Sequence, residues 1–356
     1  MAPRSVDGTR LPGAQHPSAV EIDAARRALD LAARGPETGP NPRVGAVLLS
    51  PDGTVLGEGF HRGAGTPHAE VAALEDARAR GAQVRGATAV VTLEPCRHRG
   101  RTGPCTRALL DAGVARVVLG VPDPTAAAGG GAAELRAAGV DVVEGALREE
   151  GEELLRVWLR SMRRGRPFVT LKIATTLDGR VSAADGSSRW ITSAAARAHA
   201  HSVRSRVDAI AVGTGTALGD DPELTARTAD GGLAPHQPLR VVVGRREVPE
   251  AARLHGPGGE LVRLSSQDPA EVLASLWERE VRHLLVEGGP VLTTAFLRAG
   301  LVDEVHAYVA PVLLGAGRPV VGDLGIGTLA DALRLRTVEV RHLDPDALLV
   351  ARPQEV

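Results

Sequence analysis

Aromatic side chains, cysteines and long apolar runs are all scarce in this chain of 356 residues. Phe, Trp and Tyr together make up 2% of the sequence although hydrophobic residues reach 43%, so a packed core must be built mainly from Val, Leu and Ala. No apolar run approaches the ~20 residues that a membrane-spanning helix needs, so no membrane span is expected. The formal net charge of −1 gives no electrostatic reason to expect binding to nucleic acid or to an anionic membrane surface.

The chain has two cysteines, Cys96 and Cys105, which favours a reducing compartment over a disulfide-stabilised exported protein. The N-terminal residues Met1–Pro17 are polar and include no apolar segment of the kind that secretory signals carry. We interpret residues 1–17 as a flexible leader and expect a cytoplasmic protein.

Two α/β domains are expected, because strand and helix patterns alternate on both sides of a basic Gly/Pro break at 163–167 and single cores rarely exceed ~250 residues. We place the domains at 18–165 and 166–356, each with a largely parallel sheet. The predicted helices are Ala19–Arg34, Ala69–Arg80, Thr106–Ala112, Ala132–Ala138, Glu149–Met162, Ala194–Arg204, Glu271–Arg279 and Val291–Ala299. The predicted strands are Arg43–Leu49, Thr54–Gly57, Ala87–Leu93, Ala115–Gly120, Asp141–Val143, Phe168–Thr175, Ala209–Gly213, Arg240–Val243, His283–Glu287 and Glu304–Val309.

A candidate metal site lies in the first domain. His68 begins a predicted helix, and Cys96 and Cys105 follow a predicted strand, so the sequence offers one imidazole and two thiolates. Catalytic zinc takes three protein ligands and leaves a fourth position for water. Glu70, two residues after the histidine, is then a carboxylate that can move protons without binding the metal. The cysteine spacing excludes a CxxC redox pair and the compartment disfavours a disulfide, but two unrelated core cysteines remain an alternative.

Three stretches carry a closer resemblance. PNPRVGAVLL (40–49), HAE (68–70) and LEPCRHRGRTGPC (93–105) resemble the deaminase half of the bifunctional riboflavin-biosynthesis deaminase/reductases, in which a Gly-Arg-Thr core, here 100–102, covers the pyrimidine site. The resemblance implies a cytidine-deaminase-like three-layer α/β domain and one zinc ion per chain, held by His68, Cys96 and Cys105. It also implies that Asn41 contacts the substrate, although a turn residue before proline would look the same.

This half departs from the family pattern at three places. Arg97 stands where the family mostly has Ser, Gly103 replaces the first of two prolines, and the loop after Asp123 lacks an expected asparagine. None of these changes removes a zinc ligand.

The second half has no G-x-G-x-x-G motif after a strand, so a Rossmann dinucleotide site is not expected. Its motifs KIATTLDGR, SRWITS, GTGTALGDDPELTAR and VEGGP resemble the reductase half of the same enzymes, which implies a dihydrofolate-reductase-like α/β fold and NADPH as cofactor. By this resemblance the cofactor contacts are Ala174, Trp190, Thr216, Asp220 and the turn Gly289, Pro290, Val291, Leu292, Thr293, Thr294 and Ala295. The substrate contacts are Ser188, Arg204, Leu224, Arg227 and Glu287, with Lys172 as an additional polar contact.

Arg245 stands where the family has a cofactor-binding serine, and we expect it to pair with the 2′-phosphate of NADPH. The sequence as a whole then predicts a zinc-dependent deamination of a phosphoribosylaminopyrimidine, followed by NADPH-dependent reduction of its ribosyl chain to ribityl. The alternative is a deaminase whose second domain has diverged from reduction. A small-molecule substrate, no nucleic acid or membrane partner, and a homo-oligomer (dimer or tetramer) are expected.

Overall fold

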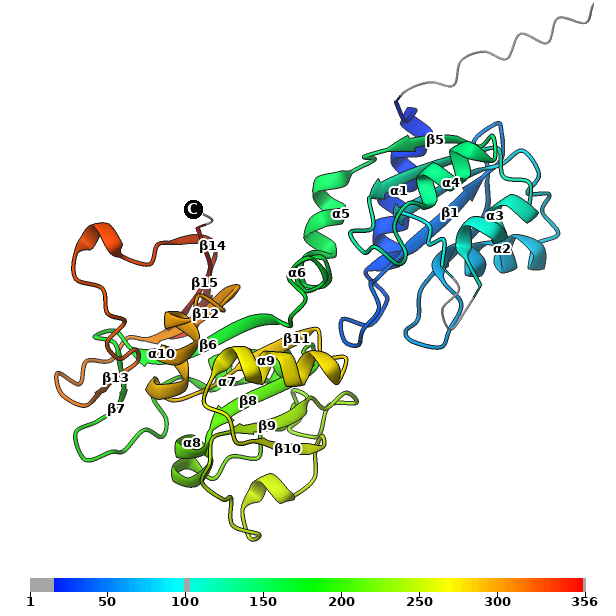
Figure 1. Cartoon of the computed structure of the whole chain (residues 1–356). Coiled ribbons are helices and arrows are strands. Elements are labelled where there is room, and N and C mark those ends of the chain that lie inside the picture. The colour runs from blue at the N-terminus through cyan, green and yellow to red at the C-terminus, as the bar shows by residue number, and fades with distance from the viewer. Residues whose placement is uncertain (1–15, 99–102, 355–356) are drawn as a thin grey trace, which may run out of the picture. The chain divides into compact units, whose positions relative to one another are not determined.

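The computed structural model describes residues 16–98 and 103–354 (Figure 1). The chain divides into two compact units, and the predicted leader lies largely outside the described residues. The first unit comprises Asn41–Leu159 with the segment that ends at Pro36, and the second runs from Arg160 onward and includes Glu37–Pro40. Within the described ranges, no helix is both long and apolar enough to cross a membrane.

The first unit is a five-stranded sheet between two layers of helices. Its elements are α1 (Ala19–Ala32), β1 (Gly45–Leu49), β2 (Val55–Phe60), α2 (Ala69–Ala79), β3 (Thr88–Leu93), α3 (Cys105–Asp111), β4 (Arg116–Val121), α4 (Gly131–Ala137), β5 (Asp141–Glu144) and α5 (Arg148–Leu154). The strand order is β2-β1-β3-β4-β5. Helices α2, α3 and α4 contribute to the core on one face, whereas α1 packs on the other (Figure 1). The predicted three-layer α/β class is confirmed.

Small residues replace the missing aromatics at the helix–sheet contacts of this unit. A Cβ atom at Gly45 would lie 2.0 Å from the carbonyl oxygen of Ala28 in α1. At Gly57 and Gly59 a Cβ would lie 2.4 Å from backbone atoms of Ala73 in α2. These glycines let both helices lie directly against the sheet, so α2 is held tightly where it begins at the candidate metal site.

The second unit is built on an eight-stranded sheet. Its elements are α6 (Arg156–Arg164, which starts in the first unit), β6 (Phe168–Thr176), β7 (Arg180–Ser182), α7 (Ala194–Arg204), β8 (Ala209–Gly213), α8 (Thr214–Asp220), β9 (Leu239–Val243), the 3₁₀ turn η1 (Arg253–His255), β10 (Leu261–Leu264), α9 (Pro269–Glu278), β11 (His283–Val286), α10 (Pro290–Arg298), β12 (Glu304–Ala310), β13 (Arg318–Pro319), the 3₁₀ turn η2 (Leu329–Asp331), β14 (Leu335–Leu343) and β15 (Asp346–Pro353).

The strand order of this sheet is β10-β9-β8-β11-β6-β12-β15-β14. The six strands from β10 to β12 are parallel, and β15 and β14 add an antiparallel edge. Helices α9 and α10 pack on one face, and α7 and α8 pack on the other.

Two sequence predictions need correction, and the C-terminal hairpin was missed. The first sheet is mixed rather than largely parallel, because β1 runs antiparallel to both β2 and β3. The single predicted helix over 149–162 is two helices, because Leu155 ends α5 and packs into the core, and α6 then takes another direction (Figure 1). The hairpin of β14 and β15 was not predicted, since nearly every residue of β14 is exposed and shows no buried alternation.

The predicted basic break between the domains is ordered around one buried carboxylate. The side chain of Asp303 is 0% exposed. Its oxygens lie 2.5 Å from Nη1 of Arg164 and 2.7 Å from Nη1 of Arg166, and it accepts the backbone N–H of Val169 at 2.8 Å. Nε of Arg160 lies 3.7 Å away. The basic residues at the start of the second unit therefore compensate an internal charge instead of forming a solvated linker.

Candidate active sites

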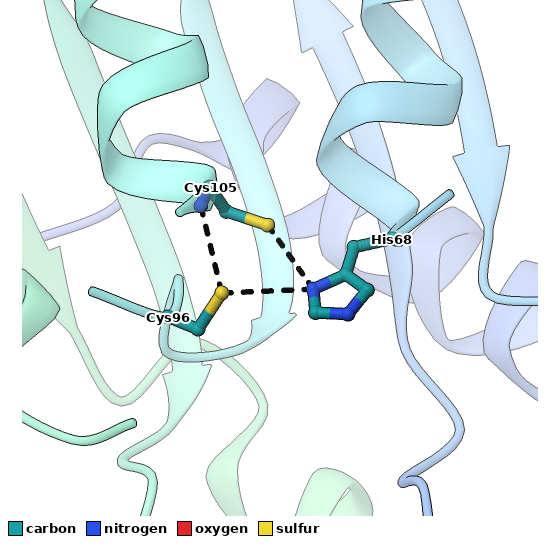
Figure 2. Close-up of side chains that lie close together, drawn as sticks. All are labelled: His68, Cys96 and Cys105. Atoms are coloured by element: carbon teal, nitrogen blue, oxygen red, sulfur yellow. Dashed lines mark hydrogen bonds between the residues drawn. The ribbon is translucent and has the colours of Figure 1, made fainter. Parts of the chain in front are cut away.

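The three predicted zinc ligands lie together in the first unit. His68 is the residue immediately before α2, Cys96 follows β3, and Cys105 is the first residue of α3. Nδ1 of His68 lies 3.6 Å from Sγ of Cys96 and 3.3 Å from Sγ of Cys105, and Figure 2 shows both sulfurs directed at that nitrogen. Among the residues that the structure describes, they form the one group of metal-binding side chains with ligand atoms this close, all within 4.8 Å.

The geometry fits zinc. Bond lengths of about 2.0 Å to nitrogen and 2.3 Å to sulfur in a tetrahedral site separate the nitrogen from the sulfur by about 3.5 Å, close to the observed distances. Hydrogen bonding from Cys105 and then from His68 lowers the pKa of Cys96, whereas the hydrogen bond to Cys96 raises the pKa of Cys105. The metal-free site thus favours one thiolate and one thiol, and a bound dication would favour two thiolates.

Glu70 lies in the first turn of α2 and is 3% exposed. It interacts with the thiol of Cys105, while its Oε2 is buried without a hydrogen-bond partner in the described part of the chain. Burial raises the pKa of Glu70 to about 7. A buried carboxylate with one unused oxygen beside the candidate ligands is placed to exchange protons with a reactant bound at this site.

Asn41 is fixed by a histidine that the sequence did not single out. Nδ1 of His61 donates to the carbonyl of Pro67 at 3.1 Å, which leaves Nε2 to accept a hydrogen bond from Nδ2 of Asn41 at 2.9 Å. His61 is 4% exposed, and its ring lies edge-on to that of His68 with 5.3 Å between centroids. The carbonyl oxygen of Asn41 keeps its acceptor capacity for another group.

A cavity of about 610 Å³ in the second unit brings together most of the residues expected there. The predicted residues that line it are Lys172, Ala174, Ser188, Trp190, Arg204, Thr216, Asp220, Leu224, Arg227 and Glu287. They come from β6, α7, α8 and the segments after β7, α8 and β11, which are far apart in the sequence. Trp190 is 69% exposed, so its ring is available to a bound molecule.

A buried ion pair forms one wall of this cavity. Arg204 makes a bidentate pair with Glu287, at 2.7 Å from Nε to Oε1 and 2.8 Å from Nη2 to Oε2, and its Nη1 donates to the carbonyl of Thr225 at 3.0 Å. Nζ of Lys172 lies 3.6 Å from Oε2 of Glu287. Burial alone would raise the pKa of Glu287, but the charges of Arg204 and Lys172 outweigh burial and hold the pKa at about 2. Glu287 is therefore an anion at neutral pH.

The turn 289–295 does not line the cavity. Leu292 and Thr293 are buried, so only backbone or neighbouring side chains of this turn can meet a ligand, and the N–H of Gly289 donates to Oγ1 of the cavity residue Thr216 at 3.2 Å. Arg245 also lies outside the cavity lining, exposed beyond the end of β9.

Comparison with known proteins decides the family. Residues 20–121 match the cytidine and deoxycytidylate deaminase zinc-binding region, and residues 167–349 match the RibD C-terminal domain. A riboflavin biosynthesis protein RibD from Mycobacterium tuberculosis is 50% identical over 88% of this chain and 91% of its own length. The chain belongs to the RibD family.

Other RibD proteins agree over nearly the whole length. The RibD of Escherichia coli K12 is 40% identical over 91% of this chain and 96% of its own. A crystal structure from Thermotoga maritima, described as a diaminohydroxyphosphoribosylaminopyrimidine deaminase/5-amino-6-(5-phosphoribosylamino)uracil reductase, superimposes with a TM-score of 0.84 at 35% identity. It covers 94% of this chain and 99% of that one. A RibD structure from Acinetobacter baumannii also gives a TM-score of 0.84, at 36% identity and the same coverage.

Arg97, one departure from the RibD pattern, connects the zinc site to the altered loop after Asp123. Its Nε donates to the carbonyl of Gly129 at 2.6 Å, and its side chain lies against Gly130, whose φ is +93°. The neighbouring Ala128 is buried against Cys96 and Cys105. The arginine and the glycine-rich loop therefore fit each other. Nothing in the structure explains Gly103, and the Gly100–Thr102 motif lies outside the described residues.

The carboxylate of Glu94 also holds this loop, and the sequence analysis did not single it out. Its carboxylate accepts the backbone N–H groups of Asp123, Gly130 and Ala132 at 3.0, 3.1 and 2.8 Å. The glutamate of the motif Glu-Pro-Cys thus positions the loop beside Cys96 rather than joining the chemistry.

Sequence reasoning also missed several polar residues of the second cavity: the charged Arg189, Arg197, Glu223 and Arg253, and His201. The guanidinium of Arg197 stacks over the ring of Trp190, with 4.5 Å from its carbon to the ring centroid. Helical spacing was an available signal, because Arg197, His201 and Arg204 follow an i, i+4, i+7 pattern on α7 and so share one face.

Proposed function

We infer that this chain is a bifunctional deaminase and reductase of riboflavin biosynthesis, as its RibD relatives are described. The observation that carries the inference is the joint presence of a His68–Cys96–Cys105 site with a buried carboxylate and a separate, arginine-rich cavity. The substrate class follows from the Thermotoga relative: a diamino-hydroxy-phosphoribosylaminopyrimidine, and then 5-amino-6-(5-phosphoribosylamino)uracil.

In the first unit, His68, Cys96 and Cys105 would hold the zinc ion. Zinc bound there supplies Lewis-acid activation of the water that displaces the amine. Glu70 accepts a proton from that water on its unused Oε2 and returns it to the departing ammonia. The amide of Asn41, held by His61, contacts the pyrimidine or its ribose. Burial of Glu70 suits both roles, because its raised pKa lets it hold or release a proton near neutral pH.

In the second unit, we propose NADPH as the hydride donor. Trp190, Thr216 and Asp220 line the cavity, and the turn 289–295, which contacts Thr216 through Gly289, offers backbone groups at the start of α10, where partial positive charge favours phosphate. Lys172, whose Nζ lies 3.6 Å from Oε2 of the anionic Glu287, is placed to orient the ribose hydroxyls and to supply the proton that accompanies hydride transfer.

The pairing of Arg245 with the 2′-phosphate of NADPH remains a prediction. Arg245 is exposed beyond β9, in the segment that reaches α8 through its neighbour Arg246, whose side chain lies beside Gly215. Arg245→Ala should lower the ratio of kcat/KM for NADPH over NADH. An unchanged ratio rejects the assignment.

The alternative, a second unit that no longer reduces, is disfavoured. The RibD C-terminal family matches 167–349, and ten of the predicted substrate and cofactor residues line one cavity. We further propose a cytoplasmic homo-oligomer. Exposed apolar side chains in the second unit, among them Leu313, Leu329 and Val340 at 70%, 82% and 67%, support self-association. Light scattering during size-exclusion chromatography tests the oligomer.

One coupled assay tests the function. Ammonia release and NADPH oxidation are followed on the same diaminopyrimidine 5′-phosphate, with and without a zinc chelator. We expect ammonia first, then NADPH oxidation, and loss of both in chelator. NADPH oxidation should return when the already deaminated uracil is supplied. Ammonia release that persists in a zinc-depleted protein would contradict the deaminase assignment, and a deaminated substrate that is not reduced would contradict the reductase assignment.

A further inference from the structure

The glycine-rich loop between β4 and α4, residues 122–130, has few polar side chains of its own to hold it. From 126 to 130 it reads AAAGG, five residues without a polar side chain. Backbone of this kind loses much conformational entropy when it is ordered, so the loop needs anchors from another segment. The segment after β3 supplies two of them, the carboxylate of Glu94 described above and the side chain of Arg97.

Arg97 holds the middle of this loop at three points. Its backbone N–H donates to the carbonyl of Ala128 at 3.3 Å, and its Nε donates to the carbonyl of Gly129 at 2.6 Å. Its guanidinium packs against Gly130, where a Cβ atom would lie 3.2 Å from Nε. The first contact would survive replacement of the side chain, whereas the other two depend on the arginine.

Gly129 carries this constraint to the start of the loop. Its N–H donates to the carbonyl of Thr125 at 2.9 Å, and a Cβ in its place would lie 2.7 Å from the carbonyl oxygen of Asp123. Oδ1 of Asp123 in turn accepts the N–H and the hydroxyl of Thr125 at 2.8 and 2.6 Å. The same carboxylate interacts electrostatically with Cys96. Arg97, Gly129 and Asp123 are therefore linked beside the candidate zinc site.

The loop also covers the two cysteines. Ala128 is 8% exposed and packs with Cys96 and Cys105, which are 8% and 0% exposed. A tight apolar cover controls how far solvent reaches a metal site and its ligands. Because Ala128 directly precedes the residue that Nε of Arg97 holds, loss of the arginine would loosen the cover over both sulfurs.

We propose that Arg97 is a positioning residue of the deaminase: acting through Gly129, it keeps Ala128 over the two cysteines and the Asp123 carboxylate beside them. The proposal rests on the deaminase function above. It accounts for two departures from the RibD pattern together, because a loop that lacks the expected asparagine is held by the arginine at position 97. The donor that matters is Nε, and a lysine has a methylene group at that place, so charge alone does not replace it.

The first test measures how fast Cys96 and Cys105, the two cysteines of the chain, react with a chromogenic aromatic disulfide in the chelator-treated protein. Arg97→Ala and Arg97→Lys should both react about five-fold faster, as expected when one hydrogen bond that closes the loop is lost. Removing a positive charge beside Cys96 would by itself slow the reaction, because it disfavours the thiolate. Arg107→Ala is the matched control, an exposed arginine of α3 that pairs with Asp111.

Unchanged rates in both Arg97 variants overturn the proposal. Faster labelling that Arg107→Ala reproduces, or that follows a lowered thermal unfolding midpoint, shows a general loss of stability and overturns it as well.

The second test follows ammonia release by the zinc-loaded variants. Zinc content should stay at one per chain, because Arg97 is not among the candidate ligands. The substrate must now order the loop when it binds, so KM should rise about five- to ten-fold in Arg97→Ala and in Arg97→Lys, with kcat within about three-fold. If Arg97→Lys keeps the wild-type KM, the arginine acts through its charge and the positioning role is refuted. A wild-type chain that releases no ammonia but shows labelling dependent on Arg97 rejects the deaminase function alone and supports the positioning of the loop.

Discussion

Replacing Glu70 by glutamine should have opposite effects on activity and on stability. The amide keeps the shape of the side chain but cannot carry a proton between water and the leaving amine, so ammonia release should fall about 10²–10⁴-fold. Zinc content should stay at one per chain, because Glu70 is outside the His68–Cys96–Cys105 group. Glu75→Gln is the control, an exposed carboxylate on the same helix.

The stability gain follows from the raised pKa of Glu70 in the metal-free protein. Burial raises that pKa from 4.5 to about 7, and each unit corresponds to about 1.4 kcal/mol, so the ionised carboxylate costs the folded unit about 3 kcal/mol. The cost is fully present above the folded pKa and vanishes below the unfolded pKa of 4.5, where both states are protonated.

Glu70→Gln should therefore raise the unfolding midpoint of the chelator-treated protein by roughly 10 °C at pH 8 and by little at pH 4.5. Thermal unfolding followed by circular dichroism measures this, and the Glu75→Gln control should show no such pH-dependent gain. Deaminase activity within ten-fold of wild type would refute the proton-transfer role. An unchanged midpoint at pH 8 would refute the claim that the buried carboxylate lacks compensation.

Three further outcomes are expected. Cys105→Ser should abolish zinc binding and ammonia release, while the rate of reduction of the deaminated substrate stays within about two-fold of the wild-type rate, because the two sites are independent. A parallel loss of reduction would contradict separate sites. Glu287→Gln leaves the buried guanidinium of Arg204 without its carboxylate partner and should destabilise the second unit by about 3–5 kcal/mol above pH 4.5. This difference should disappear as the pH falls toward the folded pKa of Glu287, about 2. Denaturant unfolding at several pH values measures it. Gly131→Ala would put a Cβ 1.8 Å from the carbonyl oxygen of Pro95, next to Cys96, and should lower both the zinc affinity and the stability of the first unit. A Cβ at Gly103 meets nothing within 4 Å, so Gly103→Ala should bind zinc as the wild type does in the same titration.

The two-unit α/β architecture could be predicted from the sequence because most strands and helices carry a clear buried pattern. The β14 strand could not, since its side chains are exposed and its place depends on pairing with β15 through the backbone. The break between α5 and α6 at Leu155 could not be predicted from the sequence either, because the helical pattern of apolar residues continues across it. The helix ends there because Leu155 packs in the core.

The His68–Cys96–Cys105 group could be predicted because metal coordination demands fixed residue types, and the chain has only two cysteines to combine with a histidine. The charge partners in the second cavity could not. The resemblance implies that Arg204 contacts the substrate, but nothing in the sequence indicates that Glu287, which follows β11, pairs with it. Pairing between distant segments is decided by the fold, so residue type alone does not show which carboxylate an arginine pairs with.

The arginine cluster on Asp303 limits how the two activities can be separated. The carboxylate is fully enclosed, and its compensating charges come from Arg160, Arg164 and Arg166, all before the first strand of the second unit. A gene cut at the start of β6, at Phe168, would produce a reductase half with an enclosed, uncompensated anion. Evolution or an engineer that divides this enzyme into two polypeptides must therefore keep α6 with the reductase, although that helix begins in the deaminase.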